Sequence, residues 1–284
     1  MAKRKLSGRQ ELKIRSDREM SVYKRDDMIQ KSRHQLTVRE QKAVLYAISK
    51  IRPEDTALQE YVFDIKDFYA LCGLESDSYT VLKALLLGLK SKSWWMQIDD
   101  EGTESAVSWF NTVRTNKKSG KVTIKFHEDM MPFLVELTKQ GAFYTGYSLQ
   151  YVLPMSSQYA PRLYELLKSY QKNNRVWFFE VEELKKLMNA QSYDRWPDFR
   201  RRVIEPALEE INKYTDIKVA YDAKKEGRRI ARIEFYMLGK KPGEILETQM
   251  LIQDELDGQY TIWDYRLQEE SEESVKARFF RENL

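Results

Sequence analysis

Four arginines lie within eight residues of one another in the second half of the chain, in the segment Arg195-Trp196-Pro197-Asp198-Phe199-Arg200-Arg201-Arg202. Such a run fits the start of a helix, because Asp194 is a suitable N-cap and proline is tolerated in a first turn. At about 100° per residue, three of the arginines fall opposite the apolar residues of that helix, namely Arg195, Arg201 and Arg202. A guanidinium donates paired hydrogen bonds to guanine edges and to phosphates. We therefore expect these three arginines to contact DNA.

Other polar residues around the helix complete this candidate set, which also contains Ser192, Tyr193 and Asp198. Arg200 projects toward the apolar side instead, and we expect it to pair with an acidic group. The alternative is that the arginines only form surface ion pairs with Glu205 or Glu209, which contribute little. The elements around the helix favour the DNA-binding interpretation.

These elements follow the order of a winged helix–turn–helix domain. They are a helix at Gln158–Tyr170, a strand at Val176–Val181, a short helix at Glu182–Asn189, the long helix at Arg195–Tyr214 and a hairpin from Ile217 to Met237. Pro206 lies inside the long helix and should bend or break it, because it leaves the carbonyl of Arg202 without a donor. The tip of the hairpin, the wing, carries four further candidate contacts: Lys224, Lys225, Arg228 and Arg229.

The first half of the chain repeats this order. Its elements are a helix at Thr37–Ile51, a strand at Tyr61–Ile65, a short helix at Lys66–Cys72, a helix at Tyr79–Lys92, and extended segments at Ala106–Arg114 and Val122–Phe126. Phe63-Asp64-Ile65 matches Phe179-Glu180-Val181, 116 residues later. The predicted fold class is therefore α+β, with two tandem winged helix–turn–helix domains of similar topology produced by internal duplication.

The first of the two domains is poor in arginine at the position of the reading helix. Its candidate DNA contacts are all lysines: Lys83, Lys90, Lys117 and Lys118. We expect such contacts to reach the DNA backbone and to add little base preference.

Charge is distributed unevenly along the chain. Residues 1–33 are predicted to form a basic arm, with 11 basic and 5 acidic side chains, and residues 244–284 an acidic tail, with 4 basic and 11 acidic ones. Between them, residues 34–145 are assigned to the first domain and residues 146–243 to the second. The arm, with its lysines and arginines from Lys3 to Arg18, has the composition of a flexible segment that binds phosphates or the minor groove, and a disordered end without a DNA contact is the alternative. The tail is expected to be solvated and partly disordered, with partner contact as the alternative.

Residue types that many enzymes and membrane proteins need are scarce. A single cysteine, Cys72, excludes an intramolecular disulfide and fits the cytoplasm. The two histidines, His34 and His127, form no metal-binding motif, and no glycine lies in a phosphate-binding-loop motif. No apolar stretch approaches the roughly 20 residues of a membrane span. We expect a binding protein with no catalytic residue, cofactor, metal or membrane contact.

Several motifs resemble those of the iteron-binding replication initiators of bacterial plasmids. They are Arg162-Leu163-Tyr164-Glu165-Leu166-Leu167, Pro197-Asp198-Phe199-Arg200-Arg201-Arg202, Glu209-Glu210-Ile211-Asn212 and Lys224-Lys225-Glu226-Gly227-Arg228. The resemblance extends roughly from Ser32 to Met237. It implies two winged-helix domains that bind directly repeated DNA sequences at a plasmid origin. The second domain would then supply the main base-reading helix.

The same resemblance implies partners and a location. A monomer would bind the repeats, and a dimer formed through the first domain would repress the protein's own gene. The host's chromosomal initiator and replicative helicase would be the protein partners. The protein would act in the bacterial cytoplasm, in association with the nucleoid or the plasmid.

Three alternatives differ in class. A winged-helix transcription regulator without an origin role would have a similar DNA-binding surface, and would be distinguished by protection of an inverted repeat in place of direct repeats. A rolling-circle nicking enzyme would need a tyrosine beside a histidine-based metal site, which two isolated histidines do not provide. A purely structural module would leave the outward arginines unexplained.

Overall fold

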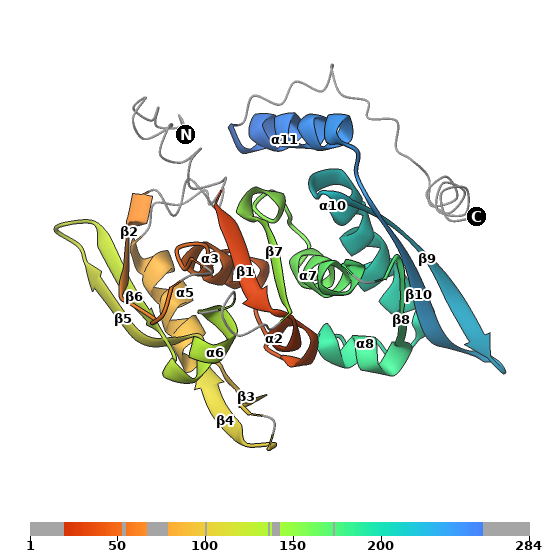
Figure 1. Ribbon diagram of the computed structural model, residues 1–284, viewed down its shortest axis with the longest axis horizontal. Coiled ribbons are helices and arrows are strands. Elements are labelled where there is room, and N and C mark those ends of the chain that lie inside the picture. Colours follow the sequence, from red (N-terminus) through yellow and green to blue (C-terminus); the bar gives the residue numbers. More distant parts are fainter. Residues whose placement is uncertain are drawn as a thin grey trace. The chain divides into compact units, whose positions relative to one another are not determined.

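A computed structural model describes residues 20–52, 55–66, 79–99, 101–135, 137, 143–172 and 174–257. The described residues form two compact units. The first unit comprises residues 20–25 and 39–153, and the second comprises residues 26–38 and 154–257. Both units combine a three-stranded antiparallel sheet with helices, which confirms the predicted α+β class (Figure 1).

The second unit contains the predicted winged-helix elements in the predicted order. They are α7 (Ala160–Gln171), β8 (Val176–Glu180), α8 (Val181–Leu187), α9 (Trp196–Phe199), the π-helical turn η3 (Arg200–Ile204), α10 (Glu205–Tyr214), β9 (Ile217–Glu226) and β10 (Arg229–Gly239). The sheet order is β8-β10-β9, so the hairpin pairs with the strand that precedes α8. Tyr164, Phe199 and Phe235 are fully buried between the helices and the sheet. This core fixes α9, η3 and α10 by their apolar side.

The long helix is continuous through Pro206 and is not broken there. A proline at this position cannot donate to the carbonyl of Arg202, and the chain responds by widening the preceding turn into η3. Within η3 the Glu205 N–H donates to the Arg200 carbonyl, five residues back. The effect of the proline was therefore predicted at the correct place, but it takes the form of a wide turn.

The first unit repeats the sheet topology of the second. Its elements are β1 (Ser21–Arg25), α3 (Val38–Ile48), β2 (Tyr61–Asp64), α5 (Tyr79–Ser91), β3 (Ser93–Gln97), β4 (Glu104–Ser108), β5 (Phe110–Asn116), β6 (Lys121–Phe126), η1 (Glu128–Met130), α6 (Met131–Leu134), β7 (Tyr144–Ser148) and η2 (Leu149–Tyr151). The sheet order β2-β6-β5 corresponds to β8-β10-β9.

Equivalent side chains support the internal duplication. Phe63 and Phe179 are both 5% exposed. One residue further on, Asp64 of β2 pairs with Lys121 of β6 at 2.9 Å. In the second unit, Glu180 of β8 pairs with Arg232 of β10 at 3.0 Å, across the equivalent pair of strands. The match predicted from the two tripeptides is thus reproduced in burial and in ion pairing.

Some elements of the first unit differ from the prediction. The segment predicted as extended over Ala106–Arg114 is divided between β4 and β5, and β4 pairs with β3, which was not predicted. Trp109, at the break between β4 and β5, is 1% exposed, so the chain turns there to place this ring in the core. The predicted short helix at Lys66–Cys72 lies outside the described residues after Lys66.

Part of the predicted basic arm is folded. Residues 21–25 form β1, which pairs with β7, and residues 26–31 form α2 (Asp26–Lys31) in the second unit. Val22, Met28 and Ile29 are buried, and these apolar positions were the missed signal. The remainder of the arm, from Lys3 to Arg18, lies outside the described residues.

The beginning of the predicted acidic tail is also folded. Residues 242–257 form helix α11 (Pro242–Asp257), in which Leu251 and Ile252 are almost completely buried. The Tyr214 hydroxyl at the end of α10 donates to Glu255 of α11 at 2.8 Å. The tail was expected to be only partly disordered, and this part of it is folded because its apolar residues supply a face that packs on α10. Residues 258–284 lie outside the described part of the chain.

Candidate DNA interface

Arg195 and Arg201 lie on either side of one carboxylate at the start of the long helix. The Arg195 Nε is 3.6 Å from Asp198 Oδ2, and the Arg201 Nη2 is 3.4 Å from Asp198 Oδ1. The two arginine side chains are 77% and 68% exposed. Ion pairs this exposed contribute only about 0–1 kcal/mol, so the guanidiniums can exchange Asp198 for a base edge or a phosphate. The three side chains therefore form one exposed, preoriented cluster.

Arg200 differs from its predicted position. It pairs with an acidic group as expected, since its Nε is 3.2 Å from Glu205 Oε1. Its side chain is 49% exposed, however, and does not enter the apolar side. The projection used 100° per residue, whereas the residues of η3 are spread over a wider turn. Arg200 is therefore rotated away from the core.

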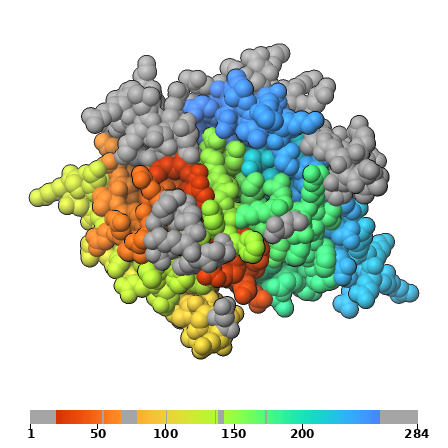
Figure 2. Space-filling view, viewed as in Figure 1, coloured from red at the N-terminus to blue at the C-terminus, as the bar shows by residue number. Residues whose placement is uncertain are grey.

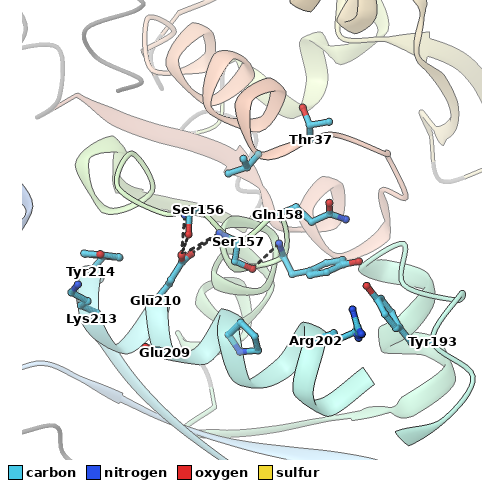
Figure 3. Close-up of a pocket in the computed structure, with 13 residues that line it drawn as sticks. Thr37, Ser156, Ser157, Gln158, Tyr193, Arg202, Glu209, Glu210, Lys213 and Tyr214 are labelled. Atoms are coloured by element: carbon cyan, nitrogen blue, oxygen red, sulfur yellow. Dashed lines mark hydrogen bonds between the residues drawn. The ribbon is translucent and has the colours of Figure 1, made fainter. Parts of the chain in front are cut away.

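Arg202 lines a groove of about 720 Å³ in the second unit (Figure 3). The groove is lined by Thr37, Val38, Ser156, Ser157, Gln158, Tyr159, Tyr193, Arg202, Pro206, Glu209, Glu210, Lys213 and Tyr214. In Figure 3 the Arg202 guanidinium lies beside Tyr193 at one end, and Lys213 and Tyr214 lie at the other end. Arg202 has no ion pair among the described side chains. Its guanidinium therefore faces a different environment from the cluster around Asp198.

Glu210 lines the groove and accepts hydrogen bonds from the residues that precede α7. Its carboxylate accepts hydrogen bonds from the Ser156 N–H at 2.9 Å and from the Ser157 N–H at 3.1 Å. The Ser156 hydroxyl also donates to it. The Glu210 carboxylate is thus hydrogen-bonded within the protein, and it connects α10 to the residues directly before α7.

Tyr159 and Tyr193 meet edge to face at the Arg202 end of the groove, with ring centroids 6.4 Å apart. Burial and then the hydrogen-bonding interaction with the Tyr193 hydroxyl raise the pKa of Tyr159 to about 12. Tyr159 therefore remains a neutral hydroxyl at physiological pH. This end of the groove offers one guanidinium and two phenol groups and contains no carboxylate that pairs with them among the described residues.

The wing of the second unit is a tight, basic hairpin tip. Gly227 adopts a φ of +61°, which a residue with a side chain rarely takes, and so closes the turn. Lys224 is 3.3 Å from Glu234, and the hydrogen bond and charge of that carboxylate raise the pKa of Lys224. The exposed residues without a paired carboxylate among those described are Lys225, Arg228 and Arg229. The wing thus presents cations directly to solvent.

The first-unit candidates are also exposed, but they lie on two separate elements. Lys83 and Lys90 are on α5, where Lys90 donates to the Asn111 carbonyl at 2.8 Å. Lys117 and Lys118 form the turn between β5 and β6, in which the Asn116 side chain accepts the Lys118 N–H at 3.0 Å. Figure 2 shows both hairpin tips extending from the surface, β5–β6 in yellow-green and β9–β10 in light blue.

The groove was missed by sequence reasoning apart from Tyr193 and Arg202. Its other wall comes from Ser156-Ser157-Gln158-Tyr159, a polar run directly before α7. Such a run before an apolar helix signals a helix start, and its proximity to the long helix depends on the tertiary fold. Ser192 is exposed beside this region, but it is not a groove residue.

The described part of the chain has neither a cluster of metal-binding side chains nor a membrane-spanning helix. No group of three or more histidine, cysteine, aspartate or glutamate side chains there is placed to hold a metal ion. His127 accepts the Asp129 N–H at 3.3 Å and so caps a turn. Within the same residues, no helix combines the length and the apolar character needed to cross a bilayer.

Comparison with known proteins identifies both units. Residues 21–168 match the family model described as "Initiator Replication protein, WH1", and residues 180–237 match "Initiator Rep protein, WH2". The chain is 30% identical to the PI protein of Escherichia coli over 131 residues, which are 41% of this chain and 43% of that protein. The chain therefore matches less than half of the length of the PI protein.

Two further similarities cover more of the chain. A replication initiation protein of Escherichia coli is 25% identical over 222 residues, which are 74% of this chain and 67% of that protein. The crystal structure of the Pi initiator protein in complex with iteron DNA has the same fold, with a TM-score of 0.63, 22% identity, and coverage of 79% of this chain and 99% of that one. This chain therefore belongs to the family of initiator replication proteins built from two winged-helix domains, WH1 and WH2.

Proposed function

We propose that this protein is a sequence-specific, double-stranded DNA-binding initiator of plasmid replication. It binds directly repeated origin sequences, iterons, as a monomer. Family membership supports the role in replication, and the name of the similar Pi structure supports iteron DNA as the ligand. The observation that carries the proposal is the exposed arginine-bearing start of the long helix beside a basic wing, in a winged-helix unit.

In the complex, α9 and η3 enter the major groove. Arg195 and Arg201 exchange the Asp198 carboxylate for base edges, at a cost that is small because the pairs are solvent-exposed. Lys225, Arg228 and Arg229 of the wing meet phosphates, and Lys224 does so after leaving Glu234. The lysines of the first unit add backbone contacts with weak base preference. The second unit therefore supplies most of the sequence specificity.

We also propose that a dimer formed through the first unit represses the protein's own gene. In α5, the element that corresponds to the reading helix, Leu87 is 68% exposed and Val81 is 37% exposed. Exposed apolar side chains at this position suit a protein contact better than a DNA contact. Sedimentation of the full chain tests this, and a Leu87→Asp variant should shift the equilibrium toward monomer without lowering affinity for a single DNA repeat.

We also propose the partners, the location and the type of activity that the family resemblance implies. The host's chromosomal initiator and replicative helicase are the expected protein partners, and the protein acts with the plasmid in the cytoplasm. Binding, and not bond cleavage, is the expected activity. Supercoiled origin DNA should therefore remain un-nicked in the presence of the protein and divalent metal.

Nuclease protection by the full chain tests the central proposal. Protection of several directly repeated segments at the replication origin is the expected result. Protection of one inverted repeat near a promoter, with no origin site, would favour the second candidate, a winged-helix transcription regulator. That alternative has specific support, because the same exposed helix and wing would serve it equally well.

A further inference from the structure

Arg201 and Arg202 are adjacent in sequence and cannot both point at the same feature of the DNA. Both residues lie in the π-helical turn η3, where their side chains have different neighbours. Arg201 shares a side with Asp198, and the two are in contact. Arg202 lines the groove beside Tyr193. If Arg201 faces the floor of the major groove of DNA, Arg202 faces one of its walls.

The walls of the major groove are lined by phosphates. An α-helix is roughly 10–12 Å wide with its side chains, and the major groove is about 12 Å wide, so a helix inserted there brings its flanks close to the sugar–phosphate backbone. A group on the flank of the reading helix therefore meets a phosphate before it can reach a base edge. Arg202 occupies such a flank.

The surroundings of Arg202 suit a phosphate chemically. Tyr159 and Tyr193 place two phenol groups at this end of the groove, with their ring centroids 6.4 Å apart. A phenol hydroxyl can donate a hydrogen bond to a phosphate oxygen. Glu209 and Glu210 line the groove farther along α10, and Glu210 is held by Ser156 and Ser157. Arg202 is the cation at this end of the groove, and Glu209 and Glu210 lie between it and Lys213 at the other end, so the Arg202 end admits a single phosphate.

We propose that Arg202 and Tyr193, supported by Tyr159, form a binding site for one phosphate of the DNA backbone at the edge of the reading helix. This inference rests on the proposed DNA-binding function and narrows it. Arg202 then fixes the position of the helix along the DNA, while Arg195 and Arg201 distinguish the bases. It divides the three arginines, all of which are expected to contact DNA, between the bases and the backbone.

The test uses the full chain and a duplex that the wild-type protein selects from a random-sequence pool. Each phosphate of that duplex is replaced in turn by an uncharged methylphosphonate. Besides losses at the phosphates that the wing and the first unit contact, wild-type protein should lose affinity on the order of tenfold at one phosphate beside the reading helix, because a charge-assisted contact is removed. Arg202→Ala should show the lower affinity on unmodified DNA and no further loss at that position. Tyr193→Phe should show a smaller loss that depends on the same phosphate.

The matched control is Arg200→Ala, which removes an adjacent arginine that pairs with Glu205. It should leave the methylphosphonate profile unchanged. Arg202→Ala should also weaken binding to selected and random duplexes equally and reduce the slope of log K against log salt by about 1.

Two results would overturn the proposed site: a loss of base preference at one position in Arg202→Ala, or a methylphosphonate profile identical to that of wild type. An unchanged thermal unfolding temperature of Arg202→Ala shows that its loss of DNA affinity results from the lost contact and not from unfolding. If the wild-type chain selects no sequence at all, the proposed function fails instead, and the salt slopes on random duplex still decide whether Arg202 meets a phosphate.

Discussion

The two units share a scaffold and differ in what they expose on it. Their sheets have the same strand order, and the Asp64–Lys121 and Glu180–Arg232 pairs occupy the same position. On the helix before the wing, the second unit exposes arginines, whereas the first exposes lysines and Leu87. A winged-helix core therefore permits specialisation of its surface without any change in topology. Under the proposed function, one copy reads DNA and the other makes weaker DNA contacts and a protein contact.

The largest expected effect comes from removing a buried aromatic ring from the core of one unit. Phe199 in the second unit and Phe126 in the first are both completely buried. Truncation of either to alanine should lower the free energy of unfolding of its own unit by about 3–5 kcal/mol. Phe199→Ala should also abolish base preference, whereas Phe126→Ala should weaken binding and retain it. Denaturant titration and competition binding measure the two quantities, and equal loss of preference in both variants would contradict the division of roles.

A smaller effect is expected at the DNA surface itself. Arg201→Ala should cost about 1–3 kcal/mol of specific binding and relax the preference at one base pair. Lys83→Ala, the comparable change on α5 of the first unit, should weaken all sequences slightly and equally. Binding to a panel of single base-pair substitutions measures the difference. Equal losses on specific and random DNA for Arg201→Ala would remove its assignment as a base reader.

The C-terminal helix adds a pH dependence to the second unit. Lys240 is 8% exposed and donates to Thr248 of α11 at 2.9 Å. Burial lowers the pKa of Lys240 to about 8, and the charged groups that face it are Lys218, Glu244, Asp216 and Glu247. Because the unfolded chain binds this proton up to a pKa near 10.4, stability should rise between about pH 8 and 10.

Lys240→Met tests this pH dependence, because it keeps the length of the side chain and removes its charge. Denaturant titrations of the second unit's transition at several pH values should show a smaller rise in the variant than in wild type. Identical pH profiles would mean that Lys240 is not responsible for the dependence.

The smallest expected effect is at the hairpin tips. Lys224→Ala should weaken binding to all sequences alike and reduce the salt slope by about 1. Lys118→Ala, at the tip of β5–β6, should change the slope less, since the first unit is expected to contact DNA more loosely. Titrations at several salt concentrations measure both variants. A larger slope change for Lys118→Ala would reverse the ranking of the two wings.

Much of the fold was predictable because its apolar residues recur with clear periods. Phe199, Val203 and Ile211 share the buried side of the long helix as expected, and the alternation in β9 and β10 correctly predicted the hairpin. β3 and β1 were missed because a short strand with one buried face, such as Ser93–Gln97, has a weak signal. The helix α11 was missed because its acidic composition was given more weight than its apolar positions.

The candidate site was predictable only where the residues are close in sequence. The cluster of Arg195, Asp198 and Arg201 follows from helical spacing. The approach of Tyr159 to Tyr193 joins residues 34 positions apart, so it requires the tertiary fold. Arg200 was placed wrongly because a regular projection does not include η3.

Because of the π-helical turn, the groups that face outward depend on the number of residues in this segment as well as on which side chains it carries. η3 sets the rotation of everything before it, including Arg195 and Asp198, relative to the buried stripe of α10. Deleting a single codon within Arg200–Ile204 would rotate the groups before the deletion by roughly 100° relative to α10 and turn a different set of them outward, while the buried residues of α10 remained in place. Recognition in such a protein could therefore diverge through a change in spacing as readily as through replacement of an arginine.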